Sequence, residues 1–288
     1  MASSPRLVFL IVAALFLAHA QTPDAVEKRI AALPPEQQAF ERFRAWVATQ
    51  PVAIRGSMGI SSQVRNPKLL EGYREYLKHC EYSEAQIGAQ FEVIRRQANS
   101  LEVEHWNRYL TAEQPAFNTK PNSFLVEMVQ GRKPGTALDV AMGQGRNALW
   151  LAQQGWSVTG FDIADEALTT ARENAARLGL KINTEVARME DFDFGESRWD
   201  LIVLSYSGCG YPFESIQRAL KPGGILVEEA FHVDATKGHG IGGSICQTGE
   251  LPHLFQELRT IRYEEPIAQP DFAKGPMRVV RFCAEKPN

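Results

Sequence analysis

Residues 137–147 read Ala137-Leu-Asp-Val-Ala-Met-Gly-Gln-Gly-Arg-Asn147, and the fold prediction rests on this stretch. The apolar run 136–140 predicts a buried strand, and the pattern over 147–154 predicts the helix that follows. Between them, Gly143 and Gly145 let the backbone turn tightly and let a ligand approach without an intervening side chain. A strand, a glycine turn and a helix in this order indicate a ligand-binding turn of an α/β sheet.

The segments on both sides of this turn continue the alternation of strands and helices. Strands are predicted over 157–161, 181–186, 200–204 and 225–229, and helices over 124–129, 165–178 and 213–220. Two more strands, 259–263 and 279–284, have no full crossover helix between them, so we expect that pair to be antiparallel. The pattern predicts an α/β fold with a Rossmann-like, doubly wound, mostly parallel seven-stranded sheet and an antiparallel last strand.

The region before this sheet has a helical pattern. A proline pair at 34–35 suits the start of a helix, and large apolar residues then recur at helical spacing in three sets. These sets are Phe40, Phe43, Trp46 and Val47; Leu69, Leu70, Tyr73, Tyr76 and Leu77; and Phe91, Ile94, Leu101 and Trp106. We expect a helical N-terminal region over 21–114, with these residues in its core, followed by a sheet domain over 115–288.

The first twenty residues have the pattern of a targeting segment. Arg6 precedes an apolar run over 7–17, and Ala18-His19-Ala20 follows as a small-residue cleavage site. This order is typical of a secretory signal peptide, and the run is shorter than the roughly twenty residues of a membrane-spanning helix. We therefore expect residues 1–20 to be a signal peptide and the mature chain to be exported, periplasmic or secreted, without a stable membrane span. An uncleaved signal would tether it to the membrane.

Charge and cysteine content limit the classes of partner. The net charge is -3 and the pI about 6.1, so no global basic field exists to hold nucleic acid. The cysteines Cys80, Cys209, Cys246 and Cys283 lie far apart and form no C-x-x-C pair, so no metal site is predicted. We interpret them as isolated, mostly buried thiols. The alternative is a disulfide bond, which could form if the protein reaches an oxidising compartment.

The residues around the glycine turn favour a cationic ligand. A dinucleotide site would have a third glycine where Ala148 stands, and the carboxylate of Asp139 would repel a pyrophosphate. Both observations weigh against an NAD-dependent oxidoreductase. Asp162 ends the second strand, about twenty residues after the turn, where an acid can accept hydrogen bonds from ribose hydroxyls. The combination suits a ligand with a positive charge and a ribose.

With these residues in place, the chain resembles the class I S-adenosylmethionine-dependent methyltransferases. Residues 138–147 resemble their first motif, and are similar in particular to the tellurite-resistance and small-molecule methyltransferase group. Residues 158–162, 199–203 and 220–224 resemble the motifs of the second, fourth and fifth strands, and the resemblance covers residues 105–288.

The resemblance implies S-adenosylmethionine as the cofactor, together with a set of contacts to it. The residues implied along the methionine part are Asp139, Ala141, Gly143, Gly145 and Ser205. Those implied at the ribose and adenine are Asp162, Ile163, Glu190 and Asp191. Two positions depart from the family pattern: Ala141 stands in place of a glycine, and Arg188 in place of the acid that contacts adenine.

The methyl acceptor is predicted to be a small molecule, and the accepting atom stays open between sulfur, nitrogen, oxygen and a chalcogen. Methyl transfer from a sulfonium needs mainly positioning of the acceptor, so no catalytic triad is expected. The Pro-Pro-Tyr and Pro-Cys motifs of nucleic-acid base methylation are absent from the sequence. Weak catalytic candidates at the carboxyl ends of strands are Tyr206, Glu229 and His232.

Two further segments and one alternative function stay open. Residues 105–109 resemble the helix that covers the cofactor in this group, with ordinary packing as the alternative. The glycine-rich stretch 238–243 is either a lid over the acceptor or a surface loop. Because S-adenosylmethionine is made in the cytosol, the predicted export also suits a non-catalytic S-adenosylmethionine-binding protein that retains the fold.

Overall fold

The computed structural model describes residues 23–51, 63–207, 212–236 and 245–288. The chain divides into two compact units, Met1–Glu102 and Val103–Asn288. The helix α7 (Glu84–Leu110) begins in the first unit and ends in the second, whereas the sequence placed the domain boundary after residue 114. The predicted signal peptide and the glycine-rich stretch 238–243 lie outside the described residues. No helix in the described part of the chain is long and apolar enough to cross a membrane.

The first unit is built from α2 (Pro23–Ala31), α3 (Pro35–Thr49), α6 (Pro67–His79) and the first part of α7. Its core confirms most of the predicted apolar sets, and Phe43 and Tyr73 meet edge to face with ring centroids 5.1 Å apart. The prediction for Leu101 is wrong, since this residue is 41% exposed. Along α7, Ile94 belongs to the core of the first unit and Trp106 to a cluster of the second, and Leu101 falls between them.

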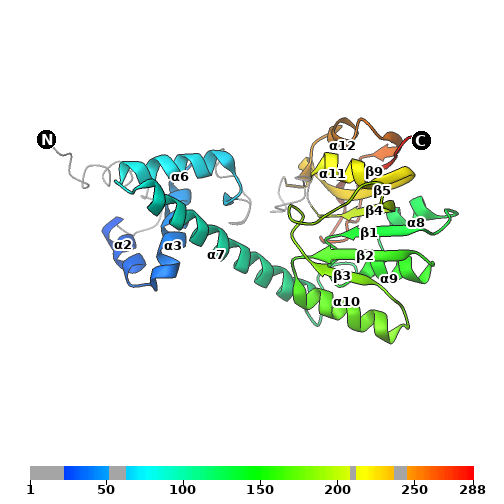
Figure 1. Ribbon diagram of the computed structural model, residues 1–288, viewed down its shortest axis with the longest axis horizontal. Coiled ribbons are helices and arrows are strands. Elements are labelled where there is room, and N and C mark those ends of the chain that lie inside the picture. Colours follow the sequence, from blue (N-terminus) through cyan, green and yellow to red (C-terminus); the bar gives the residue numbers. More distant parts are fainter. Residues whose placement is uncertain (1–22, 52–62, 208–211, 237–244) are drawn as a thin grey trace. The chain divides into compact units, whose positions relative to one another are not determined.

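The second unit contains the sheet, whose main strand order is β3-β2-β1-β4-β5-β9-β7 (Figure 1). These strands are β1 (Thr136–Val140), β2 (Ser157–Asp162), β3 (Asn183–Val186), β4 (Trp199–Ser205), β5 (Leu220–His232), β7 (Arg259–Glu264) and β9 (Met277–Glu285). The first five pair in parallel, and β9 runs antiparallel between β5 and β7. The predicted sheet is thereby confirmed. Two-residue strands β6 (Ile245–Cys246) and β8 (Ile267–Ala268) were not predicted.

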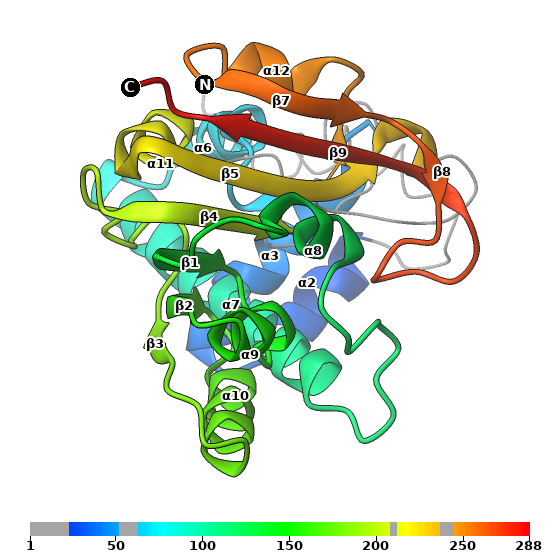
Figure 2. The same ribbon diagram turned by 90° about the vertical axis from the view of Figure 1, so that its right-hand side faces the viewer.

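Helices cover both faces of the sheet, as predicted for a doubly wound fold. Side chains of α8 (Ser123–Val129), α9 (Arg146–Gln153) and α10 (Asp165–Arg177) pack with Ala137 on one face. Those of α11 (Phe213–Ala219) and α12 (Glu250–Leu254) pack with Leu138 and Val140 on the other. In Figure 2, α8 lies in front of one end of β4, and α9 and α10 are seen below it. A short 3-10 helix, η1 (Val233–Thr236), follows β5.

The cysteines differ from the prediction at one described position. Cys80 and Cys283 are free thiols, whereas Cys246 is disulfide-bonded. The interpretation as four isolated thiols is therefore wrong for Cys246, because wide spacing in the sequence does not preclude closeness in the fold.

The start of α10 is capped by a residue from another helix. Ala164 stands at its N-cap and offers no side-chain hydrogen bond. Asn107, near the end of α7, fills this role, because its Oδ1 accepts from the Glu166 N–H at 3.1 Å and its Nδ2 donates to Asp165 Oδ1 at 2.8 Å. Asn107 is buried, so these bonds are shielded from water. They hold the end of α7 at the start of α10.

Replacing Asn107 should therefore loosen this end of the second unit. We expect Asn107→Ala to lower the local stability of α10 by about 1 kcal/mol, the usual cost of losing an N-cap. Native-state hydrogen exchange of the first α10 amides measures this loss. The exposed Glu173→Ala on the same helix is the control and should leave the exchange unchanged. Equal protection in Asn107→Ala and the wild type would contradict the capping role.

Candidate cofactor site

The turn after β1 has the backbone that the motif predicts. Gly143 and Gly145 adopt φ of 55° and 82°, and Ala141 adopts 53°. The left-handed region costs an ordinary L-residue roughly 1–2 kcal/mol. Ala141 therefore keeps a conformation that suits the glycine expected from the family resemblance. The turn is tied to the neighbouring strand by the Met142 N–H, which donates to the Phe161 carbonyl at 3.0 Å.

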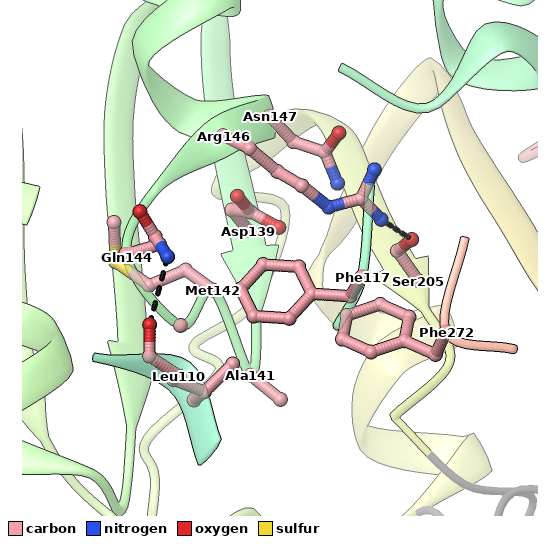
Figure 3. A pocket seen from close by; sticks show the side chains of 11 residues that line it. Leu110, Phe117, Asp139, Ala141, Met142, Gln144, Arg146, Asn147, Ser205 and Phe272 are labelled. Carbon is pink, nitrogen blue, oxygen red and sulfur yellow. Dashed lines mark hydrogen bonds between the residues drawn. The ribbon is translucent and has the colours of Figure 1, made fainter. Parts of the chain in front are cut away.

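A pocket with about 330 Å³ of space not filled by atoms, part of it open to solvent, lies on this turn (Figure 3). Its walls come from the end of β1, the turn, the start of α9, the end of β4, the last residue of α7 and two connecting segments. The lining residues are Leu110, Phe117, Asp139, Ala141, Met142, Gly143, Gln144, Arg146, Asn147, Ser205 and Phe272. Of the sequence-predicted cofactor residues, the pocket thus brings together Asp139, Ala141, Gly143 and Ser205.

Asp139 is the most exceptional side chain of the pocket. It is 1% exposed, and its Oδ2 has no hydrogen-bond partner among the described residues. Burial raises the pKa of this carboxyl to about 7, against the opposing effect of the Arg146 charge. A buried oxygen without a partner carries an uncompensated desolvation cost. A hydrogen-bond donor with positive charge, brought in by a ligand, would remove that cost.

Arg146 is the cation of the pocket lining, and its charge is already paired. Its Nη1 lies 2.9 Å from Asp271 Oδ2, and both side chains are less than 10% exposed. Nη1 also donates to the Lys120 carbonyl at 3.0 Å, and Nη2 to Ser205 Oγ at 2.8 Å. Its guanidinium carbon stands 5.4 Å from the ring centroid of Phe272. The pocket therefore holds a neutralised arginine and an unpaired carboxylate oxygen.

Asp162 supports the turn from the end of β2. Its Oδ2 accepts from the Gly143 N–H and its Oδ1 from the Ala164 N–H, both at 2.8 Å. Burial raises the pKa of this carboxyl, and these backbone bonds oppose the rise. A carboxylate oxygen has two lone pairs. The predicted ribose contact would use the lone pairs of Asp162 that do not accept from the backbone N–H groups. Asp162 does not line the described pocket, and that contact stays a prediction.

Gly145 has a packing role in the structure. A Cβ added there would meet the Ala171 Cβ of α10 at 3.1 Å, and the backbone is left-handed. The glycine therefore lets the start of α9 approach α10 closely. On the adenine side, Ile163 is half-buried and both Glu190 and Asp191 are exposed. None of these four residues lines the pocket, and their cofactor contacts stay predictions.

The weak catalytic candidates fall into two separate clusters, and none lines the pocket. The Tyr206 hydroxyl donates to Glu229 Oε1 at 2.8 Å, and Arg281 Nε donates to Glu229 Oε2 at 2.5 Å. Burial raises the pKa of Tyr206 above its ordinary range, and the Glu229 charge adds to the rise. His232 is 2% exposed and contacts Thr248 Oγ1 at 2.9 Å.

Sequence reasoning missed four residues that shape the site, namely Phe117, Arg146, Asp271 and Phe272. Arg146 stands inside the quoted motif, where its charge was a usable signal. Phe117 lies in the connection between α7 and α8, and Asp271 and Phe272 lie between β8 and β9. Such connections have no periodic pattern, so only the fold shows that they meet at the pocket.

Comparison with known proteins agrees with this geometry. Residues 137–224 match the family model described as a methyltransferase domain. The chain is 31% identical over 131 residues to the 2-heptyl-1-hydroxyquinolin-4(1H)-one methyltransferase of Mycobacteroides abscessus, covering 42% of this chain and 58% of that protein. It is 27% identical over 156 residues to hemagglutinin 1 of Eikenella corrodens, covering 52% of each. The chain thus spans less than two thirds of the length of these relatives.

Solved structures support the fold. TehB from Haemophilus influenzae superimposes with a TM-score of 0.51 at 18% identity, covering 57% of this chain and 62% of that one. A structure concerned with conversion of a disulfide bond into a thioacetal group during echinomycin biosynthesis gives a TM-score of 0.52 at 18% identity, covering 65% and 93%. The family match over residues 137–224, the glycine turn and the fold shared with these structures together support a class I S-adenosylmethionine-dependent methyltransferase domain in the second unit.

Proposed function

We propose that this protein transfers the methyl group of S-adenosylmethionine to a small-molecule acceptor by in-line displacement. The observation that carries the proposal is the unpartnered Oδ2 of Asp139 beside the glycine turn. The methionine part of the cofactor ends in an ammonium group, which is the donor that this oxygen lacks. The residues present therefore fit the group.

The chain would hold the cofactor along the carboxyl ends of β1 and β2. Asp139 would bind the ammonium group, and Asp162 the ribose hydroxyls, with Ile163, Glu190 and Asp191 toward the adenine. When bound, S-adenosylmethionine supplies a methyl group on a sulfonium, which is already an activated leaving group. The chain's own residues would position the acceptor and exclude water, which are the main contributions that such a transfer needs.

A small-molecule acceptor is favoured over nucleic acid. The net charge of -3 provides no global attraction for a phosphate backbone. A relative named ribosomal RNA small subunit methyltransferase C, from Alcanivorax borkumensis, matches over 63 residues, which is 19% of that protein. The longer match is to the enzyme named for a hydroxyquinolone, a small molecule.

The alternative function is that of an exported protein that binds S-adenosylmethionine without catalysing methyl transfer. The A-x-A site at 18–20 favours removal of residues 1–20 during export. N-terminal sequencing of the exported protein should then begin at Gln21. An intact Met1 form in the cytosolic fraction would argue against export and would also remove the reason for this alternative.

Cofactor binding and turnover are tested separately. We expect the wild type to bind S-adenosylhomocysteine, the demethylated product with the same ammonium group, in calorimetry. Asp139→Asn should weaken that binding by roughly ten- to a hundredfold, because a hydrogen bond to a charged group contributes about 1.5–3 kcal/mol. Asp193→Asn, at an exposed aspartate outside the pocket, is the control and should bind as the wild type does.

A protein that binds S-adenosylhomocysteine but transfers no labelled methyl group to thiol, amine, hydroxyl or chalcogen oxyanion acceptors would favour the non-catalytic alternative. If a folded Asp139→Asn variant bound S-adenosylhomocysteine with wild-type affinity, the proposed contact between Asp139 and the ammonium group would be contradicted.

The affinity should also depend on pH. Because the pKa of Asp139 is raised to about 7, the carboxyl is protonated and neutral below that pH. The carboxylate that pairs with an ammonium group is present above pH 7 and is lost as the pH falls through 7. We expect the Kd for S-adenosylhomocysteine to rise about tenfold per pH unit between pH 7 and pH 5. Calorimetry at several pH values measures the slope, which Asp139→Asn should flatten; a flat wild-type profile would contradict the assignment.

A further inference from the structure

A row of aromatic side chains runs along the pocket. Its members, in order of contact, are Tyr109, Phe117, Phe272, Tyr206 and Phe231, with successive ring centroids 5.6, 5.2, 5.4 and 4.8 Å apart. They come from α7, from the end of β4, from β5 and from two connecting segments. Phe117 and Phe272 line the pocket, and Figure 3 shows them beside each other, with Asp139 and Ser205 nearby.

Hydrogen bonds fix the two pocket-lining rings in place. Asn118, next to Phe117, donates its backbone N–H to the Asp271 carbonyl at 2.7 Å and its Nδ2 to Asp271 Oδ1 at 2.8 Å. Asp271, next to Phe272, also accepts from Asn122 Nδ2 at 2.8 Å. The planes of the two rings differ by 14°, so the rings lie nearly parallel, and each is held by its own connecting segment.

The charges around this aromatic surface disfavour an anionic acceptor. Arg146 is the only cation among the described residues that line the pocket. It is paired with Asp271 and donates to Ser205 and the Lys120 carbonyl. Asp139 adds a carboxyl to the lining. With the cofactor's ammonium group on Asp139, an oxyanion would meet no unpaired cation among the described lining residues, since Asp271 already neutralises Arg146.

We propose that the methyl acceptor is a planar ring compound without negative charge, which stacks on Phe272 and Phe117. This assignment rests on the proposed methyltransferase function. Aromatic faces bind flat rings by offset stacking, and a rigid surface loses little conformational entropy when it binds. For a ring hydroxyl, the oxygen lone pair forms the new O–CH3 bond as the S–CH3 bond breaks. Sulfur retains the electron pair of that bond, and the hydroxyl proton passes to water.

Binding of 1-naphthol to the complex with S-adenosylhomocysteine tests this surface by calorimetry. Phe272→Leu keeps an apolar side chain but removes the ring, and we expect it to weaken naphthol binding at least tenfold. Phe272→Tyr keeps the ring and should bind naphthol as the wild type does. Phe213→Leu on α11, where the ring packs against Phe255 on the other face of the sheet, is the matched control and should change nothing. S-adenosylhomocysteine is kept at a saturating concentration for each variant, as determined by a separate titration, and thermal unfolding verifies that each variant folds. Phe213→Leu, which lies outside the pocket lining, should bind S-adenosylhomocysteine within about twofold of the wild type.

Turnover provides a second measurement. With labelled methyl donor, we expect transfer to 1-naphthol, with a KM that rises in Phe272→Leu more than kcat falls. Transfer to selenite or 2-mercaptoethanol without transfer to 1-naphthol would overturn the acceptor class. So would naphthol binding that is absent in the wild type or unchanged in Phe272→Leu. Loss of S-adenosylhomocysteine binding by the wild type would instead overturn the proposed function itself.

Discussion

The ion pair between Arg146 and Asp271 is the interaction on which the pocket depends. It joins the first residue of α9, next to the glycine turn, to the connection between β8 and β9. A buried ion pair is maintained only when the remaining donors and acceptors are also satisfied. Here Asn118, Asn122 and Ser205 provide the further bonds. The same network places Phe117 and Phe272 on the pocket wall, so the electrostatics and the shape of the site have one origin.

Local patterns were sufficient to predict the sheet and the centre of the site. The run into Gly143 predicted a strand, a tight turn and a helix, because glycine and apolar periodicity act over a few residues. The antiparallel β9 followed from the missing crossover helix. Asp271 and Phe272 could not be predicted as site residues, since Asn118 and Phe117, two of the partners that place them there, lie more than a hundred residues earlier in the chain. The cofactor contact of Gly145 stays a prediction, and the closeness of α10 at this glycine could not be read from the sequence.

The candidate catalytic residues show a similar limit. Their position at strand ends was sound, but the direction of a side chain there depends on tertiary contacts. Tyr206 adopts a left-handed φ of 58° and turns its hydroxyl to Glu229. Left-handed backbone in a bulky residue is costly and persists only where the surroundings enforce it. The buried bond between Tyr206 and Glu229 is part of that enforcement, and a catalytic role of either residue stays a prediction.

Ala141 has a consequence for how this site can change. Its methyl group stands on the pocket wall in a backbone conformation that favours glycine. Exchange to glycine would relieve the strain and widen the pocket in one step, whereas every larger residue would keep the strain and add bulk. At this position, substitution by glycine is therefore favourable, and substitution by nearly any other residue is not. Proteins that keep alanine at this position have a slightly strained backbone turn and, in return, a narrower ligand pocket.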